Sequence, residues 1–144
     1  LSSAAGYGEN TEGSEEIPVS GEGQFILNHM AFHVRISDAE GMDFDYTGIP
    51  VKTYTKWLDC DKMKRNIVLR TRRAGDYLVI NGQGGRKKLK AFLIDEKVPA
   101  EMRDRIVVLA SGSEVYWVVG YRISESVKVS AETCHIMEIR AEAF

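Results

Sequence analysis

Residues 106–119 read IVVLASGSEVYWVV, two apolar runs on either side of a short polar segment. The runs Ile106–Leu109 and Val115–Val119 are rich in β-branched and aromatic residues, which favour strands. Ser111-Gly112-Ser113 between them has the composition of a tight turn. The stretch therefore predicts a β-hairpin, and we expect Trp117 to lie in its core.

Further strands are predicted on both sides of this hairpin. Apolar residues alternate from Ile26 to Ile36, with Asn28 as an exception, so one half-buried strand is expected there. The Gly-rich segment Asn81–Gly85 is expected to be a loop. Other β-prone segments are found at 43–47, 51–58, 67–70, 77–80 and 134–141.

Two short helices are predicted in the middle of the chain. The apolar residues at 87–97 follow a helical period, and a proline separates this helix from a second one over 100–105. Asp59 or Asp61 can cap a helical turn at 62–64. Because strands and helices do not alternate as in a parallel sheet, the fold class expected is mostly β, α+β, with a β-sandwich and roughly six to eight strands.

The composition is that of an ordinary globular protein, with 44% hydrophobic and 28% charged residues. Residues 1–18 are rich in Ser, Gly and Glu, and are expected to be a flexible linker or an expression remnant. Residues 19–58 form a β-rich leading segment, and 59–144 the main domain. No apolar run is long enough to span a membrane and no signal peptide is visible, so a cytoplasmic location without membrane contact is expected.

The charges are segregated along the chain. Residues 1–61 hold 11 acidic and 3 basic side chains, whereas residues 62–97 hold 11 basic and 3 acidic ones. Within the basic segment, Arg70–Arg73 leaves a strand and enters a turn, and Arg86-Lys87-Lys88 follows two glycines at an expected helix start. Backbone N–H groups at such a helix start favour anions, so the cluster predicts phosphate binding. A solvated basic face paired with the acidic segment is the alternative.

The sequence gives little support for a catalytic site or a metal site. His29 and His33 share one face of an expected strand but lie about 13 Å apart there, so no metal site is expected. Cys60 and Cys134 lack a CxxC partner and are expected to be buried thiols. The sequence contains no nucleophile elbow, Walker loop or dinucleotide fingerprint.

Three ordered blocks resemble the C-terminal domain of the tRNA(Ile)-lysidine synthetase family. They are RTRRAGD at 70–76, KKLKAFLIDEKVP at 87–99 followed by Arg103 and Arg105, and WVVGYRISE at 117–125 followed by Lys128. Ala74 stands where the family commonly has proline, and Ala91 where it commonly has aspartate. The resemblance implies a tRNA-binding domain over 59–144, with a fold similar to a domain of the phenylalanyl-tRNA synthetase β chain.

The resemblance also implies what this chain lacks. The family's catalytic N-terminal domain uses an SGGxDS-like loop to activate the wobble cytidine with ATP before lysine attacks, and no such loop occurs here. The chain is therefore expected to be a non-catalytic fragment without a cofactor of its own, ATP and lysine being substrates of the parent enzyme. The partners expected are an isoleucine tRNA, gripped at its acceptor stem, and, for the parent, a possible second copy in a homodimer.

The residues expected to contact phosphate or ribose are cationic members of these blocks. Arg70 or Arg122 could instead pair with Asp76, Asp95 or Glu125 to fix loops. Trp57 and Tyr77 could stack on a base, although packing is the commoner role of such residues. A protein-interaction module docking an acidic partner or the catalytic domain is the alternative function. The full set of contact residues is Arg70, Arg72, Arg73, Lys87, Lys88, Lys90, Arg103, Arg122 and Lys128.

Overall fold

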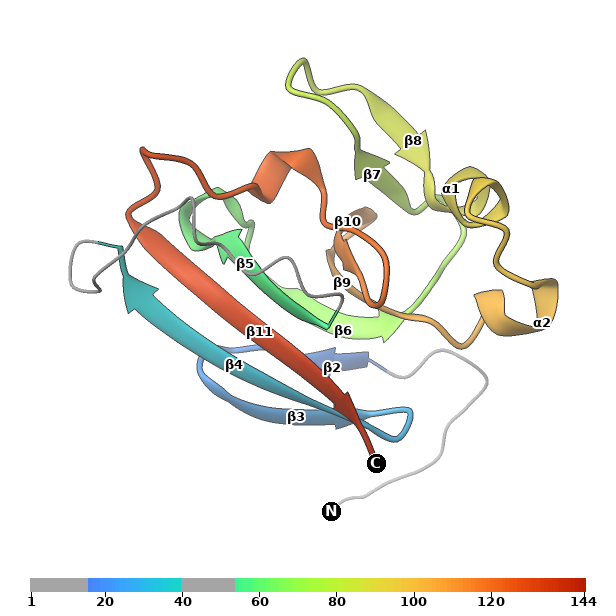
Figure 1. The fold of residues 1–144 in the computed structure, drawn as a ribbon, viewed down its shortest axis with the longest axis horizontal. Helices are drawn as coiled ribbons and strands as arrows, with labels where there is room; N and C mark the ends of the chain where they lie inside the picture. The colour runs from blue at the N-terminus through green and yellow to red at the C-terminus, as the bar shows by residue number, and fades with distance from the viewer. Residues whose placement is uncertain (1–15, 40–53) are drawn as a thin grey trace.

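The computed structural model describes residues 16–39 and 54–144. Ten strands in these ranges form two sheets, and two short α-helices lie beside the larger sheet (Figure 1). The fold is thus mostly β, with two packed sheets, as the sequence predicts. The number of strands exceeds the predicted six to eight.

The larger sheet has six strands in the order β2-β6-β9-β10-β7-β8. Its neighbours are antiparallel except for β10 and β7, which pair in parallel at Glu114 and Tyr77. The predicted hairpin forms its centre. The strands are β2 (Glu16–Pro18), β6 (Ile67–Thr71), β7 (Tyr77–Val79), β8 (Arg86–Lys88), β9 (Val107–Ser111) and β10 (Glu114–Val118).

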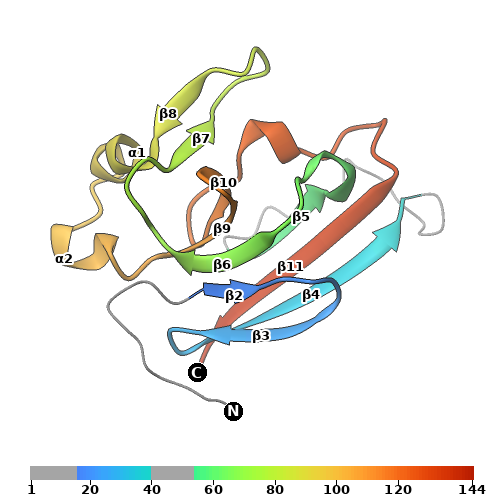
Figure 2. The ribbon, with the colours of Figure 1, turned by 180° about the vertical axis from the view of Figure 1, so that it is seen from behind.

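The smaller sheet has four antiparallel strands in the order β3-β4-β11-β5. Its long central pair, β4 and β11, runs diagonally across the molecule, in front of the larger sheet in Figure 1 and behind it in Figure 2. The strands are β3 (Gly23–Leu27), β4 (Met30–Asp38), β5 (Thr55–Asp59) and β11 (His135–Ala143).

Two hydrophobic clusters cover the two faces of the larger sheet. One lies between the sheets, where Phe32 meets Trp117 edge to face at 6.5 Å. The other lies between the larger sheet and its helix, and includes Val108 and Phe92. Because both faces are covered, all residues of β9 and β10 are buried. A β-bulge between Val115 and Trp117 shifts the register of this central hairpin.

The helical segments are short and follow the strands closely. The helices are α1 (Leu89–Asp95) and α2 (Ala100–Arg103), and the 3-10 turns are η2 (Cys60–Lys62) and η3 (Glu125–Val127). Asp59, one of the two predicted caps, caps η2 by accepting a hydrogen bond from the Asp61 N–H, although this turn begins two residues before the predicted one at 62–64. The predicted helix over 87–97 is shorter than expected, because residues 86–88 pair with β7 as a strand.

The prediction of one strand over Ile26–Ile36 is wrong. Asn28 and His29 both have positive φ, at 54° and 62°, and form a two-residue turn between β3 and β4. Asparagine tolerates this backbone conformation, which two-residue hairpin turns require. Ile26 consequently lies on the solvent face, with 53% of its surface exposed.

The predicted division of the chain at residues 18 and 58 does not match the structure. Residues 16–18 are not linker, because they pair with β6 as strand β2. Strands before and after residue 58 share one sheet, and one core cluster contains residues from both parts. The strand predicted at 43–47 and the start of the one at 51–58 lie outside the described residues.

The start of β11 is tied to two other segments by a histidine. His135 places Nδ1 2.7 Å from Asp61 and Nε2 3.1 Å from Asp38. The hydrogen bond with Asp61 raises the pKa of His135 above 6.5 and lowers that of Asp61 below 3.8. The stabilisation linked to His135 is therefore complete below pH 6.5 and is lost as pH rises through the folded-state pKa.

We expect His135→Gln to weaken the pH dependence of stability on the alkaline side. The wild-type chain should lose its advantage over the variant as pH rises from about 6.5 through the raised folded-state pKa of His135, because the imidazolium is then neutralised. Urea unfolding across this range measures the difference. A constant difference between the two proteins would contradict the ion-pair assignment.

Candidate nucleic-acid interface

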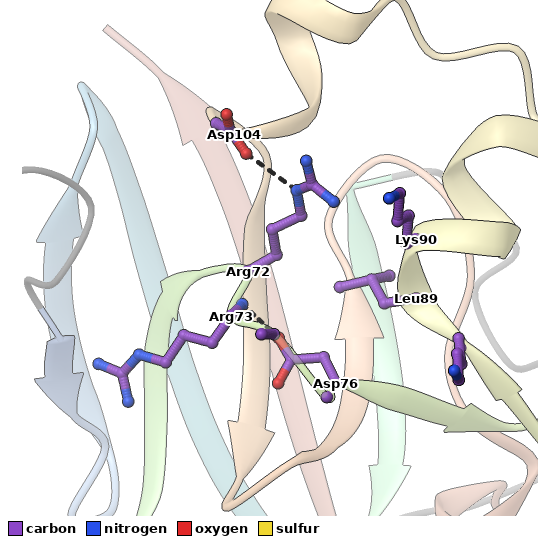
Figure 3. A pocket seen from close by; sticks show the side chains of 9 residues that line it. Arg72, Arg73, Asp76, Leu89, Lys90 and Asp104 are labelled. Carbon is purple, nitrogen blue, oxygen red and sulfur yellow. Dashed lines mark hydrogen bonds and ion pairs between the residues drawn. The ribbon is translucent and has the colours of Figure 1, made fainter.

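A basic pocket of about 430 Å³ opens beside the C-terminal end of β6. The turn after β6 forms one wall, and the junction of β8 with α1 forms another (Figure 3). Four cationic side chains and two carboxylates line it. The lining residues are Arg72, Arg73, Ala74, Gly75, Asp76, Lys88, Leu89, Lys90 and Asp104.

The wall after β6 is a tight turn with a defined geometry. The Asp76 N–H donates to the Arg73 carbonyl at 3.2 Å, and Gly75 has φ +90°. A four-residue turn with positive φ at its third residue favours glycine there and proline at its second residue, which here is Ala74. The turn directs Arg72 toward Lys90 (Figure 3), and it directs Arg73 toward Glu16 on β2.

A buried ion pair between Arg70 and Asp76 holds this turn in place. Arg70 and Asp76 join through two hydrogen bonds of 2.9 Å, and Arg70 also donates to the Thr71 and Gly112 carbonyls. Asp76 additionally accepts the Arg73 N–H, at 2.7 Å. The Asp76 carbonyl accepts the Leu89 N–H at 2.9 Å, so the same residue holds the start of α1.

The prediction that Arg70 contacts phosphate is therefore corrected by the structure. Only 1% of Arg70 is exposed, and its guanidinium donors are directed to Asp76 and backbone carbonyls. The alternative of a loop-fixing pair with Asp76 is confirmed. Arg70 is thus a positioning residue for the pocket.

Lys88 and Lys90 are the most available cations of the pocket. Both are exposed, and neither has an ion pair or side-chain hydrogen bond within the part of the chain that the structure describes. Lys88 is the N-cap residue of α1, and the first turn of this helix carries no acidic side chain. Cations oppose the helix dipole at this end, so the local structure alone does not favour them.

The arginines of the pocket are engaged at its rim. Arg72 Nε lies 2.9 Å from Asp104, whose side chain is 79% exposed, and Arg73 Nη2 lies 2.8 Å from Glu16. Exposed pairs of this kind contribute little stability, so their partners can exchange for a phosphate at small cost.

The other predicted contact residues lie outside this pocket. Lys87 forms an ion pair with Asp95, and Arg103 donates to the Val98 carbonyl. Arg122 and Lys128 both approach Glu125, at 3.4 and 3.9 Å, which confirms the loop-fixing alternative for Arg122. The structure therefore brings together four of the nine predicted residues: Arg72, Arg73, Lys88 and Lys90.

The glycine-rich segment before the second sequence block also differs from its prediction. Gly84 and Gly85 do not open a helix; they close the β7–β8 hairpin, where Asn81 Oδ1 accepts the N–H groups of Gln83 and Gly85. Arg86 lies over the Tyr77 ring at 4.2 Å. Tyr77 is thus covered by a cation, and phosphate binding by a helix N-terminus after these glycines is not supported.

His33 and Trp57, both named from the sequence, lie close to carboxylates of β11. His33 Nε2 lies 3.5 Å from Glu142, and Trp57 Nε1 donates to Glu138 at 2.9 Å. Cys134 is exposed rather than buried. Over 16–39 and 54–144, no three or more His, Cys, Asp or Glu side chains gather as a metal site would require. No helix in these ranges has the length and hydropathy needed to cross a membrane.

These features define a class: a mostly β, two-sheet domain that holds several cations around one surface pocket. A family model described as the TilS substrate C-terminal domain matches residues 67–140. The chain therefore belongs to the TilS C-terminal domain family.

Curated relatives and one solved structure agree with this membership. The tRNA(Ile)-lysidine synthase of Clostridium tetani is 37% identical over 135 residues, covering 94% of this chain and 28% of that protein. The tRNA(Ile)-lysidine synthase of Caldanaerobacter subterraneus subsp. tengcongensis is 49% identical over 86 residues, covering 60% of this chain and 18% of that protein. A crystal structure of a TilS C-terminal domain matches with a TM-score of 0.70 at 22% identity, covering 90% of this chain and 97% of that chain.

Proposed function

We propose that this domain binds tRNA for a tRNA(Ile)-lysidine synthase, with the basic pocket holding backbone phosphates of the acceptor stem. The relatives that carry this name are several times longer, since the chain spans 18% to 28% of their length. In this proposal ATP and lysine act in another part of the enzyme, and an isoleucine tRNA is the substrate.

The observation that carries the proposal is the pairing state of the pocket cations. Lys88 and Lys90 line the same basic pocket as Arg72 and have no acidic partner among the described residues. Two unpaired ammonium groups near a guanidinium create a site for an anion with several oxygens, such as a phosphodiester.

An RNA stem suits such a site better than a small anion does. The A-form major groove is too deep and narrow for side chains, so proteins recognise stems through phosphates, 2′-hydroxyls and shape. The pocket is an open surface between two chain segments, and its cations lie on both walls. They can therefore contact neighbouring phosphates along a backbone.

The test is the salt dependence of tRNA binding by Lys88→Ala/Lys90→Ala. Each phosphate that the variant no longer neutralises should lower the slope of log K against log salt by about 0.7 to 0.9, so the slope of the double variant should fall by up to about 1.8. The same relation gives a roughly 10- to 20-fold weaker affinity at 0.2 M salt. Fluorescence anisotropy with labelled isoleucine tRNA and an unrelated tRNA measures both quantities.

Lys62→Ala/Arg65→Ala is the control for net charge, because it removes two exposed cations before β6, at the opposite end of that strand from Arg72. Lys62, unlike the pocket lysines, lies 3.8 Å from Asp59, so the stability of this variant is measured alongside its binding. Its slope and affinity should remain close to those of the unchanged chain. Equal losses in both variants would indicate a nonspecific charge effect. Unchanged binding by the Lys88/Lys90 variant would overturn the proposal and favour a protein-docking role for this face.

A further inference from the structure

We infer that a second, largely apolar hollow beside the basic pocket holds an unpaired nucleobase of the bound RNA. This inference rests on the proposed function, because the base would belong to the same RNA whose phosphates occupy the basic pocket. The hollow measures about 630 Å³, within the range of small-molecule sites. Its chemistry, its free cation and its position support this ligand.

The walls of the hollow present large apolar groups to solvent. Tyr54, Met102 and Tyr121 line it with 50%, 43% and 36% of their surface exposed. Six large hydrophobic residues of the described ranges are exposed to this degree, so half of them meet here. Ile106, Val107 and Val119 also line the hollow. Bases stack well on tyrosine rings, whereas their polar edges remain near water.

The two tyrosines are held in place by their backbones and neighbours. The Tyr54 carbonyl accepts the Ala141 N–H at 2.8 Å, and the Tyr121 ring meets Phe92 edge to face at 6.3 Å. Gly120 between the walls has φ +90°, and a Cβ there would lie 3.4 Å from the Tyr54 hydroxyl oxygen. The Tyr54 backbone and the Tyr121 ring are thus positioned before any ligand enters, which lowers the entropy cost of binding.

A cation at the hollow identifies a nucleotide rather than an apolar peptide as the occupant. Arg105 is exposed and lines the hollow, and its guanidinium has no partner within the described part of the chain. The carboxylate of Glu142 is already compensated, since it lies 2.8 Å from Arg140. An aromatic wall with a free arginine complements a base and its phosphate.

The position of the hollow connects it to the basic pocket. Both are lined by α2 or the segment that joins it to β9: Asp104 in that segment lines the basic pocket, whereas Met102 on α2 and Arg105 in the segment line the hollow. An RNA strand whose paired phosphates lie against Lys90 can therefore leave the stem and reach the tyrosines. Single-stranded nucleotides next to a stem are the RNA elements whose bases are free to stack.

The test compares a blunt RNA duplex with the same duplex carrying a four-nucleotide overhang that contains 2-aminopurine. The overhang should tighten binding by about 5- to 100-fold, the usual gain for one stacked base. Tyr121→Ala should remove most of this gain and the fluorescence change of the probe, and leave blunt-duplex affinity unchanged. Tyr121→Phe should retain both. Arg105→Ala should lower the gain and its salt dependence.

Ile26→Ala on β3 is the control, because Ile26 is also a large exposed hydrophobic residue but does not line the hollow. If blunt and overhang duplexes bind equally well, or Tyr121→Ala and Tyr54→Ala leave the gain intact, the nucleobase inference is overturned and the proposed function stands. If neither duplex binds, the proposed function itself fails. Loss of binding to the rest of the enzyme in Tyr121→Ala, with RNA binding unaffected, would assign the hollow to protein docking instead.

Discussion

Asp76→Ala is expected to destabilise the domain by about 3–5 kcal/mol, because it leaves a buried guanidinium without its counter-ion. Arg70 is 1% exposed and its charge is neutralised by Asp76 through two hydrogen bonds. The truncation also removes the acceptor of the Arg73 N–H in the turn. Chemical denaturation with urea, followed by Trp fluorescence, measures the loss.

The exposed pair of Arg72 and Asp104 at the rim of the same pocket is expected to contribute much less stability than the buried pair. Asp104→Ala removes the 2.9 Å partner of Arg72, but the Asp104 side chain is 79% exposed. We expect a cost between 0 and about 1 kcal/mol, because solvent screens exposed pairs. A loss below 1 kcal/mol for Asp76→Ala, similar to that for Asp104→Ala, would show that the buried pair does not hold the turn.

This contrast bears on how the pocket works. Asp76 contacts Arg70, Arg73 and the Leu89 N–H, so one residue sets the positions of the turn and of the helix start. The cations on both walls therefore keep their spacing in the absence of a ligand. A preorganised set of cations loses less side-chain entropy when phosphates bind.

The central hairpin can be predicted because its signals are local. Ser111-Gly112-Ser113 has turn chemistry, and the runs on either side are strongly β-prone. Its bulge at Val115–Trp117 has no such signal, because it depends on packing against both faces of the sheet. The helical period places the start of α1 two residues too early, since Lys87 and Lys88 pair with β7.

The error at Ile26–Ile36 has a specific physical cause. A two-residue turn makes Leu27 and Met30 cross-strand partners, so the buried face changes from odd to even positions. Phe25 and Phe32 then lie opposite each other, and Ile26 points to solvent. The alternation across the turn imitates one continuous strand, and the only local signal against it is the polar residue at position 28.

The candidate site is predictable as a basic segment but not residue by residue. Arg70 and Lys90 are both cations of the basic segment, and the sequence gives no reason to treat them differently. Only the fold shows that Arg70 is buried against Asp76 and that Lys90 is exposed. The apolar hollow carries no sequence signal, because Tyr54, Met102 and Tyr121 come from separate segments that meet only in the folded chain.

Reversing the charge of the two available pocket cations should have the largest effect on RNA binding. For Lys88→Glu/Lys90→Glu we expect affinity to fall by about 10³-fold at 50 mM salt. Two phosphates are no longer neutralised, and this accounts for a roughly 70- to 200-fold loss of affinity. Repulsion between the new carboxylates and the RNA backbone accounts for the rest. The effect should shrink steeply as salt is raised, because exposed charges are screened.

The same substitutions should not harm the fold. Lys88 is the N-cap residue of α1 and Lys90 lies in its first turn, where no acidic residue occurs in the native chain. Acidic side chains at this end interact favourably with the helix dipole, so stability should stay constant or rise by up to about 1 kcal/mol. A variant that gains stability while losing RNA affinity would show that these lysines serve binding rather than structure.

The control for the binding loss is Lys62→Glu/Arg65→Glu, which makes the same change in net charge at the other end of β6. Its RNA affinity should fall by less than about 10-fold, and a loss equal to that of the Lys88/Lys90 variant would refute the assignment of the site to this pocket.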